Sequence, residues 1–350
     1  MAPVSLHPGT ASSVARAADD AAARIPGFGV DIAATLAWCR EVGATAVLGA
    51  VPHEVQWEVL ATTAARDVTA ARMLEPHLDA LNVLAEADAA DGPGPRHHPD
   101  LSDIGVSAES TWGVFAAEGP GVRVDAREVD GGWMLSGTKP WCSLAAQLTH
   151  ALVTAHVEGG RRLFAVALQS PKVTAHDGPW HARGLADVVS APVDFDDAPA
   201  VPVGATDWYL RRPGFAPGGI GVAACWWGAA SGLIPALTRA AAREGADQLS
   251  RVHLGRADSA LWGARAALAE AAAIAAAGSA TGLLAARVRT IVADAAELVL
   301  READHALGPL PLVADDAHAR RVGDLHLYLR QHHGERDSAR IGREISETRT

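Results

Sequence analysis

The segment Gly131–Ala145 of this 350-residue chain holds side chains that could bind a flat heteroaromatic ring. Trp141 and Ser143 stand two residues apart in an extended stretch, and strand side chains repeat every two residues, so both should share one face. An indole can pack against a ring such as the isoalloxazine of a flavin, and a hydroxyl can reach its polar edge. Lys139, one of only two lysines in the chain, precedes the pair. The alternative is that Trp141 is a core residue beside a strand turn.

A second candidate segment is 331–337, near the C-terminus, where histidines and acids cluster. His333 could exchange a proton near neutral pH, and Glu335 follows two residues later. The alternative is structural, because His332 and His333 also suit the C-terminal end of a helix, where the helix dipole favours positive charge.

Histidines elsewhere give weaker signals. His77 lies on the apolar side of a predicted helix and is expected to be a packed side chain, whereas Glu75 points about 200° away from it. His97 and His98 lie in the proline- and glycine-rich loop 91–100 without a third ligand at metal-type spacing, so no metal site is predicted. The chain also lacks a GxGxxG or Walker-type phosphate loop.

Composition limits the classes of function. Apolar residues make up 49% of the chain, charged residues 20%, and the formal net charge is −11. Such a chain forms a globular protein with sizeable cores, and its acidity argues against nucleic-acid binding, which needs a basic surface. Cys39, Cys142 and Cys225 are far apart and are expected to be reduced thiols. Without a signal-type start or a long apolar run, we expect a cytoplasmic protein with no membrane span.

Periodicity divides the chain into three stretches. Part of the first 25 residues is expected to be disordered, a helix begins after Asp31, and helical spacing recurs over 55–84. Apolar residues nearly alternate over 111–203, which predicts short strands, with a turn at Ser136-Gly137. Long helices are then predicted over 221–243, 247–277, 281–307 and 315–332. This pattern gives an α+β protein that ends in a helical bundle.

Three segments resemble the acyl-CoA dehydrogenase family. GGWMLSGTKPWCSLA resembles the stretch in which Gly-x-Lys-x-Trp-x-Ser/Thr leads into the flavin site. RGLADVVSAPVDFDDAPAVP resembles a strand and its exit, and LYLRQHHGERDSARIGREI resembles the last part of the family's chain. The resemblance runs from about Trp57 onward. It implies an N-terminal helical domain (1–108), a central β-barrel domain (109–205), a C-terminal four-helix bundle (206–350) and bound FAD.

The resemblance also assigns cofactor contacts. Trp141 and Ser143 would hold the flavin ring, and Glu118 stands in a loop that touches the flavin in the family. Arg243 matches an arginine that meets the flavin diphosphate of a neighbouring subunit, although the family's Phe-Gly does not follow it. The stretch 307–311 replaces a Gly-Gly-x-Gly turn, and this loss weakens the expected recognition of the diphosphate.

The catalytic base is expected near the end of the chain. Many members of the family carry a glutamate in Tyr-Glu-Gly-Thr, and setting Gly334 against that glycine puts His333 at the position of the base. Glu335 is the second choice. Since His333 replaces a carboxylate, the base motif is altered relative to the family.

The resemblance implies a flavin-dependent oxidoreductase that acts on the CH–CH group of an acyl thioester such as an acyl-CoA, with the acyl chain and the electron acceptor left open. One alternative is a relative of the flavin monooxygenase type, which the histidine favours. Another is a flavin-free paralogue with a structural or binding role, which the lost motifs favour. The resemblance also implies a homodimer or homotetramer formed through the C-terminal helices, with Trp226-Trp227 at the contact.

Overall fold

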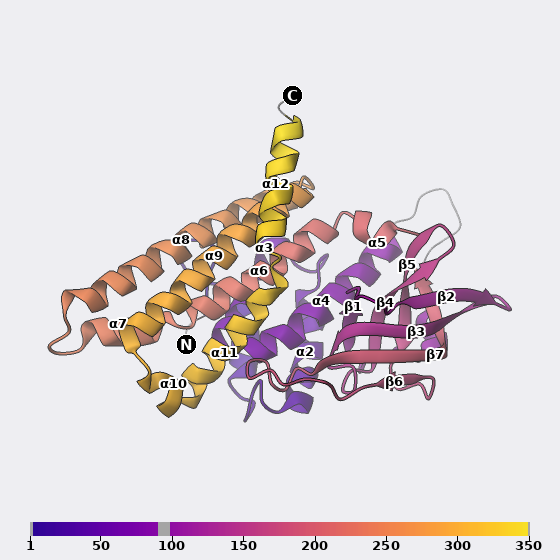
Figure 1. Cartoon of the computed structure of the whole chain (residues 1–350), viewed down its shortest axis with the longest axis horizontal. Helices are drawn as coiled ribbons and strands as arrows, with labels where there is room; N and C mark the ends of the chain where they lie inside the picture. The colour runs from indigo at the N-terminus through magenta and orange to yellow at the C-terminus, as the bar shows by residue number, and fades with distance from the viewer. Residues whose placement is uncertain (1–2, 90–98, 349–350) are drawn as a thin grey trace.

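The computed structural model describes residues 3–89 and 99–348. Along the chain, helices are followed by strands and then by helices again. The strands gather at one end of the molecule, the long C-terminal helices extend to the other end, and α12 stands out from the body (Figure 1). The α+β class predicted from periodicity is confirmed. Most of the predicted loop 91–100, including His97 and His98, lies outside the described residues.

The N-terminal stretch is helical in its described part. Its elements are α1 (Ser13–Ala22), α2 (Ile32–Ala46), α3 (His53–Arg66), α4 (Val68–Ala89) and the 3-10 turn η1 (Leu101–Ile104). Asp31 caps α2 as predicted, because its carboxylate accepts the Ala34 N–H. The expectation of disorder is wrong for α1, which buries Ala15 and Ala22 in the main core.

The central strands form a closed sheet. They are β1 (Trp112–Phe115), β2 (Val124–Val129), β3 (Gly132–Ser143), β4 (His150–Val157), β5 (Gly160–Ala167), β6 (Val173–Ala175) and β7 (Ser190–Val203). Neighbouring pairs follow the path β4-β2-β3-β7-β5, and the pairing of β5 with β4 closes it into a barrel. A second apolar cluster joins the barrel to α4, with Val83 packed beside Trp112 and Leu163.

The pairing of β3 with β7 is irregular at two places, with the extra residue in β7 at the first and in β3 at the second, and β3 carries no turn. The predicted turn at Ser136-Gly137 is wrong: the strand continues, and its register against β7 shifts between Leu135 and Gly137. Gly137 has a φ of +117° and approaches Arg123 so closely that a Cβ would overlap the Arg123 carbonyl oxygen. The second shift, between Lys139 and Cys142, leaves Trp141 at a φ of +61°. Both shifts are β-bulges, which bend a strand and redirect its side chains.

The C-terminal stretch is again helical. Its elements are α5 (Trp208–Arg211), α6 (Phe215–Ser231), α7 (Ile234–Ala242), α8 (Gln248–Ala276), α9 (Gly282–Leu307), α10 (Leu310–Ala314), α11 (Asp316–Tyr328), η2 (Leu329–Gln331) and α12 (Glu335–Thr348). Helix α6 contacts both α3 and α9. It can approach α3 closely because Gly228 lies where a Cβ would overlap the Ala61 carbonyl oxygen.

Two predictions for this stretch need correction. The single helix expected over 221–243 is divided into α6 and α7, since Pro235 lacks an N–H and is suited to the first turn of a new helix. Trp226 and Trp227, expected at a subunit contact, are buried within the chain, and Trp227 Nε1 donates to the Leu261 carbonyl oxygen. The stretch Phe215–Ala242 is long and apolar enough to cross a membrane, but 67% of its most apolar window is buried inside the protein, as in a core helix.

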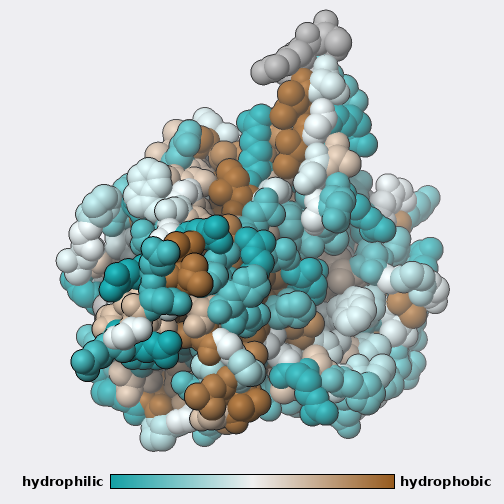
Figure 2. All heavy atoms as spheres, turned by 60° about the vertical axis from the view of Figure 1, so that its left-hand side comes forward, coloured by the Kyte–Doolittle hydropathy of each residue, from teal (hydrophilic) through white to brown (hydrophobic). Residues whose placement is uncertain are grey.

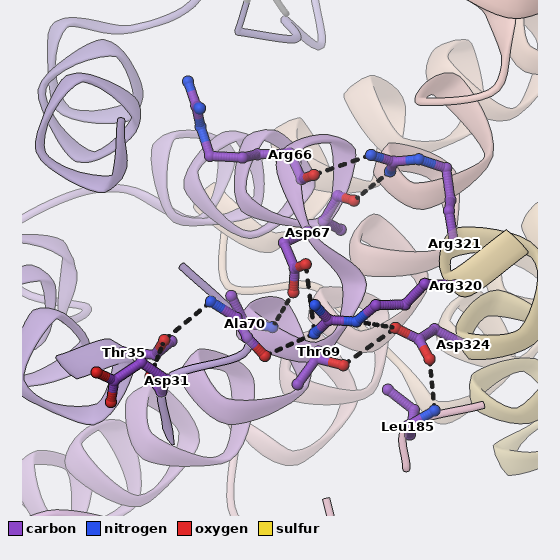
Figure 3. Close-up of polar contacts among 12 residues, drawn as sticks. Asp31, Thr35, Arg66, Asp67, Thr69, Ala70, Leu185, Arg320, Arg321 and Asp324 are labelled. Atoms are coloured by element: carbon purple, nitrogen blue, oxygen red, sulfur yellow. Dashed lines mark hydrogen bonds and ion pairs between the residues drawn. The ribbon is translucent and has the colours of Figure 1, made fainter. Parts of the chain in front are cut away.

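A buried polar junction holds the barrel, α4 and α11 together (Figure 3). The Asp324 carboxylate on α11 accepts the Leu185 N–H at 2.5 Å and the Thr69 hydroxyl at 3.0 Å. Arg320 pairs with Asp324 and with Asp67, whose carboxylate also accepts the Ala70 N–H at the start of α4. Desolvation by burial raises the pKa of both carboxyl groups. We interpret this network as a structural junction, because its charged groups pair with one another.

Candidate functional site

A cavity of about 480 Å³ lies among α3, α4, the start of α6 and the α8–α9 turn. Part of its wall is apolar and comes from Trp57, Leu60 and Leu78, which are all buried. Exposed lining residues, among them Ala85 and Gly278, mark its mouth. A concave, partly apolar space with a few polar groups is the usual form of a small-molecule site.

Polar side chains of α4 line this cavity in a single stripe. Glu75, Asp79, Asn82 and Glu86 are spaced by four, three and four residues, so they lie on one face of the helix. Asn82 Oδ1 accepts the Leu48 N–H at 2.8 Å. The carboxylates at the other three positions make the cavity acidic.

Glu75 is the deepest of these acids, with a side chain that is 14% exposed. Its Oε2 atom lies 3.4 Å from Arg72 Nη1 and 3.4 Å from the Tyr328 hydroxyl. Desolvation raises the pKa of Glu75 to about 7, although the charges of Arg72 and Arg289 act in the opposite direction. A carboxyl group that titrates near neutral pH inside a cavity can exchange protons with a ligand.

Arg212 holds the other two acids of the stripe. Its Nη2 lies 2.9 Å from Asp79 Oδ1 and its Nη1 lies 2.8 Å from Glu86 Oε2. The Gly214 N–H adds a hydrogen bond of 2.8 Å to Glu86 Oε1. Arg212 is 4% exposed, and its Nε atom has no hydrogen-bond partner among the described residues.

Of the residues predicted to hold a flavin, Ser143 is connected to this cluster. Its Oγ accepts a hydrogen bond of 3.0 Å from Arg72 Nη2 and shares one of 2.7 Å with Ser190 Oγ. A hydroxyl has one donor and two acceptor positions, so Ser143 can make one further hydrogen bond. Ser143 therefore stands between the barrel and the inner end of the cavity.

Trp141 is 63% exposed, whereas Ser143 is 8% exposed. Trp141 and Ser143 were expected to share one face of the strand. They do not, because the bulge puts the Trp141 backbone in the left-handed region of φ and ψ. A bulky residue at positive φ is a genuine outlier that costs energy, and such strain collects at functional sites. The bulge turns the Trp141 indole away from the barrel core. On the surface, this indole is available to a flat ligand.

Glu118 lies beside this segment but faces an ion-pair cluster. Its Oε1 is 2.9 Å from Lys139 Nζ and 3.4 Å from Arg161 Nη1. Lys139 is 2% exposed and also donates to Thr154 Oγ1 at 2.8 Å. Desolvation by burial lowers the pKa of this lysine, against the opposing effect of Glu118. The pair fixes the 116–121 loop next to the bulge of β3.

The other predicted site residues lie at helix ends. Arg243 is exposed at the C-cap of α7. His333 and Glu335 are exposed at the start of α12, and neither lines the cavity. His332, one residue earlier, has its ring centroid 6.1 Å from that of Trp226. The structure therefore brings Trp141, Ser143 and Glu118 to one side of the barrel, without linking them to the other three residues.

Orphaned polar atoms bear on whether a cofactor fits near this junction. Trp226 Nε1 and His332 Nδ1 are buried without a hydrogen-bond partner among the described residues, although Asp337 Oδ2 lies 3.4 Å from the His332 atom. These two atoms have no accessible surface, so the contacts available to a flavin are the exposed indole of Trp141 and the free acceptor position of Ser143. We judge these residues compatible with a flavin. In the described part of the chain, no group of three or more His, Cys, Asp or Glu side chains could hold a metal ion.

Sequence reasoning missed the polar stripe and weighed His77 instead. His77 is 3% exposed, its Nδ1 accepts the Trp112 N–H at 3.2 Å, and burial lowers its pKa to about 4. It is the packed histidine that was predicted. The spacing of Glu75, Asp79 and Glu86 was readable in the sequence, because three acids on one face of a helix with apolar flanks is an unusual pattern.

Comparisons with known proteins identify the fold. No family model and no curated protein matches this chain by sequence. Solved structures do match. A structure of KijD3 in complex with FMN and dTDP-3-amino-2,3,6-trideoxy-4-keto-3-methyl-D-glucose is similar with a TM-score of 0.76 at 20% identity, over 94% of this chain and 92% of that one.

Two acyl-CoA dehydrogenases are similar to the same extent. Glutaryl-CoA dehydrogenase from Mycobacterium smegmatis matches with a TM-score of 0.77 at 19% identity, over 96% of this chain and 95% of that one. Butyryl-CoA dehydrogenase from Megasphaera elsdenii matches with a TM-score of 0.76 at 15% identity, over 97% and 100% of the two chains. The chain therefore has the acyl-CoA dehydrogenase-like fold, and the predicted resemblance is confirmed at the level of the fold.

Proposed function

We propose that this protein is a flavin-dependent oxidoreductase acting on a small molecule that enters the α4 cavity. The observation that carries the proposal is Trp141, a tryptophan at a φ of +61° that is 63% exposed beside Ser143. Strain of this kind persists only where the surrounding structure enforces it, so we assign the exposed indole a ligand contact. The fold and the flavin complexes among its structural neighbours support this assignment.

The cofactor contacts follow the predicted residues. A bound flavin would supply the two-electron acceptor that amino-acid side chains lack. Trp141 would pack against the ring, and the Glu118 loop would lie alongside. Ser143 would accept a hydrogen bond from the polar edge, because its own hydrogen goes to Ser190 Oγ, which donates to the Val188 carbonyl oxygen. Arg243 is assigned to the diphosphate of a flavin bound by a neighbouring subunit. FAD is the cofactor that we propose, and FMN is the alternative, since it is bound by one structural neighbour.

Proton transfer needs a base that the substrate can reach. Glu75 meets this requirement, because it lines the cavity and its pKa lies near neutrality. It can accept the proton that leaves the substrate as the substrate is oxidised. His333 and, after it, Glu335 stay predictions for the same role, and both are exposed at the start of α12. The rates of flavin reduction in variants of Glu75, His333 and Glu335 identify which of the three is the base.

The finer proposal for the substrate is the CH–CH group of an acyl thioester such as an acyl-CoA, which rests on the resemblance of 131–145 and 183–202. The second candidate is a monooxygenase-type reaction of a reduced flavin with oxygen. It is favoured by His333, which replaces the glutamate of the family. A flavin-free paralogue is the third candidate and predicts a colourless protein.

Assembly into a homodimer or homotetramer and a cytoplasmic location are part of the proposal. In Figure 2, apolar residues run along one side of α12 where it stands out from the body. The large apolar residues of this helix are Ile341 and Ile345, and both are partly exposed in the single chain. A second subunit could cover them, and sedimentation of the purified protein tests this.

Anaerobic mixing of the reconstituted protein with butyryl-CoA tests the reaction. If the flavin is bleached, Glu75→Gln should slow bleaching by about 10²–10⁴-fold, the range for loss of a general base. His333→Gln and Glu335→Gln are measured in the same way, and the variant with the largest loss of bleaching rate identifies the base. A flavin that butyryl-CoA does not reduce would contradict dehydrogenation of this thioester. Oxygen-dependent product formation with chemically reduced flavin would then support the monooxygenase candidate.

A further inference from the structure

The charged groups in the wall of the α4 cavity have partners within the protein. Arg212 binds both Asp79 and Glu86, and Arg72 lies beside Glu75. An ion pair that is already formed leaves little unbalanced charge for a ligand to compensate. The charges of the cavity therefore give no reason to expect a charged ligand.

The two amide side chains in the same wall are satisfied as well. Gln56 Nε2 donates to the Ala46 carbonyl oxygen at 2.7 Å, and Asn82 Nδ2 donates to Gln56 Oε1 at 3.0 Å. Asn82 Oδ1 accepts the Leu48 N–H at 2.8 Å. Each amide thus has a partner in the protein for both its nitrogen and its oxygen.

Two polar rings of α3 in this wall have no such partner. His53 and Trp57 both line the cavity, and neither side chain makes a hydrogen bond with a described residue. Trp57 is 1% exposed, but its Nε1 is not among the fully buried atoms that lack a partner. The small accessible surface of this indole therefore includes Nε1. A Cβ on Gly221, another lining residue, would lie 3.6 Å from this nitrogen, so the N–H group borders the cavity wall.

His53 and Trp57 form one polar spot in a partly apolar wall. They stand four residues apart on α3, and their ring centroids are 5.9 Å apart. Burial lowers the pKa of His53, against the opposing effect of Glu86, so the imidazole is neutral at neutral pH and has one donor and one acceptor nitrogen. Leu60 and Leu78 supply apolar surface in the same cavity.

An unsubstituted alkyl chain does not suit this pair of rings. Water can hydrogen-bond to both rings when no ligand is bound, but methylene groups would displace it and leave the donors unpaired, which costs affinity. A keto oxygen could accept from both rings, and a hydroxyl could accept from the indole N–H while donating to the imidazole. A carboxylate would be repelled by the acids of α4.

We infer that His53 and Trp57 bind a neutral oxygen atom, an oxo or a hydroxyl group, on the acyl chain of the substrate. This inference names the substrate class of the proposed oxidoreductase and rests on that function for its catalytic meaning. The binding itself does not require a flavin. The oxygen atom selects the chain and is unchanged in the reaction.

Three six-carbon thioesters of N-acetylcysteamine test the inference: hexanoyl, 5-oxohexanoyl and 5-hydroxyhexanoyl. They differ only near the far end of the chain, where the deeply buried Trp57 is expected to meet it. Titration calorimetry on the purified full-length protein, repeated with chemically reduced flavin so that no probe is oxidised, measures their dissociation constants. The 5-oxo or the 5-hydroxy probe should bind about ten-fold or more tightly than the hexanoyl probe, as expected for a buried donor that would otherwise be unpaired. A hexanoyl probe that binds as tightly as both others, or no binding of any of the three, would overturn the inference.

Variants locate the contact. Trp57→Phe keeps an aromatic ring but removes the N–H group, so it should remove most of the preference for an oxygen-bearing chain, and His53→Phe should act in the same direction. Trp262→Phe is the matched control, because Trp262 is 64% exposed on α8 and does not line the cavity. Thermal unfolding identifies any variant that fails to fold, and the wild-type probe series needs no variant. Full preference in a folded Trp57→Phe variant would place the oxygen elsewhere and contradict the inference.

The two proposals fail separately. A colourless protein that prefers the oxygen-bearing probes would contradict the flavin function and support the contact with His53 and Trp57. A yellow protein that binds the hexanoyl probe as tightly as the other two would overturn this contact and leave the flavin function intact.

Discussion

Arg72 Nη2 donates a hydrogen bond of 3.0 Å to Ser143 Oγ, so one guanidinium joins helix α4 to strand β3. The other terminal nitrogen of the same group lies 3.4 Å from Glu75 Oε2. The inner end of the acidic cavity is thereby connected to the strand that turns Trp141 outward. A ligand in the cavity and a ring on Trp141 would lie on the two sides of this arginine.

Replacing Trp141 with alanine should weaken flavin binding. The loss of one aromatic stack of about 0.5–1.5 kcal/mol corresponds to roughly 2- to 10-fold in the dissociation constant. Trp262→Ala is a matched control, because Trp262 is 64% exposed on α8, far along the chain from the bulge of β3. Flavin fluorescence titration measures both variants. A Trp262→Ala variant that loses as much affinity as Trp141→Ala would argue against a specific contact.

Glu75→Gln should change the pH dependence of stability. In the wild type the pKa of Glu75 rises on folding from 4.5 to about 7, chiefly through desolvation, so the contribution of this group is fully present below pH 4.5 and is lost as the pH rises through about 7. The charged and titratable groups that act on it are Arg72, Asp79, Arg289 and Tyr328. The shift corresponds to about 3 kcal/mol. The neutral variant should therefore gain stability relative to the wild type between pH 4.5 and 7, as followed by urea unfolding at several pH values, and parallel profiles would contradict this.

The Lys139–Glu118 pair gives an asymmetric prediction. Glu118→Ala leaves the ammonium of Lys139, which is 2% exposed, with Thr154 as its remaining partner, and should lower the free energy of unfolding by about 2 kcal/mol. Lys139→Met removes the buried charge and leaves Glu118, which is 38% exposed, to be hydrated, so it should cost less. Chemical denaturation of both variants measures the order. A larger loss for Lys139→Met would show that the pair is not limited by desolvation of the lysine.

Gly184 should not tolerate a side chain. A Cβ at this position would overlap the carbonyl oxygen of Gly323 on α11, beside the Leu185–Asp324 hydrogen bond. Gly184→Ala should therefore destabilise the protein by roughly 1–3 kcal/mol. Gly255→Ala, in α8 with open space around it, should stabilise the helix by about 0.5–1 kcal/mol. Melting temperatures that move in the same direction for both variants would contradict this packing account.

Periodicity and turn signals predicted the helix breaks correctly, but they did not predict the irregular pairing of β3 with β7. The glycine and proline breaks at Gly278 and Pro309 do separate helices α8, α9 and α10, because these residues act through their own backbone conformation. Ser136-Gly137 has the composition of a turn but continues the strand opposite an extra residue of β7, with Gly137 against the carbonyl of Arg123, the residue before β2. A contact of that kind depends on the tertiary structure and leaves no local signal.

In the candidate site, too, local signals identify some residues, whereas others depend on the tertiary structure. Trp141 and Ser143 could be found from local residue types, but their different exposure arises from a register shift against β7. The acids of α4 could be found from helical spacing. Their partner Arg212 could not, because it lies 126 residues after Glu86 in the sequence and reaches the cavity only through the packing of α6 against α4.

The absorption spectrum of the purified protein after incubation with FAD or FMN and removal of free flavin tests the central claim most directly. We predict a yellow protein with the absorption bands of a bound flavin, in a ratio approaching one flavin per chain, and lower occupancy in Trp141→Ala. A folded wild-type protein that retains neither FAD nor FMN would contradict the proposed function.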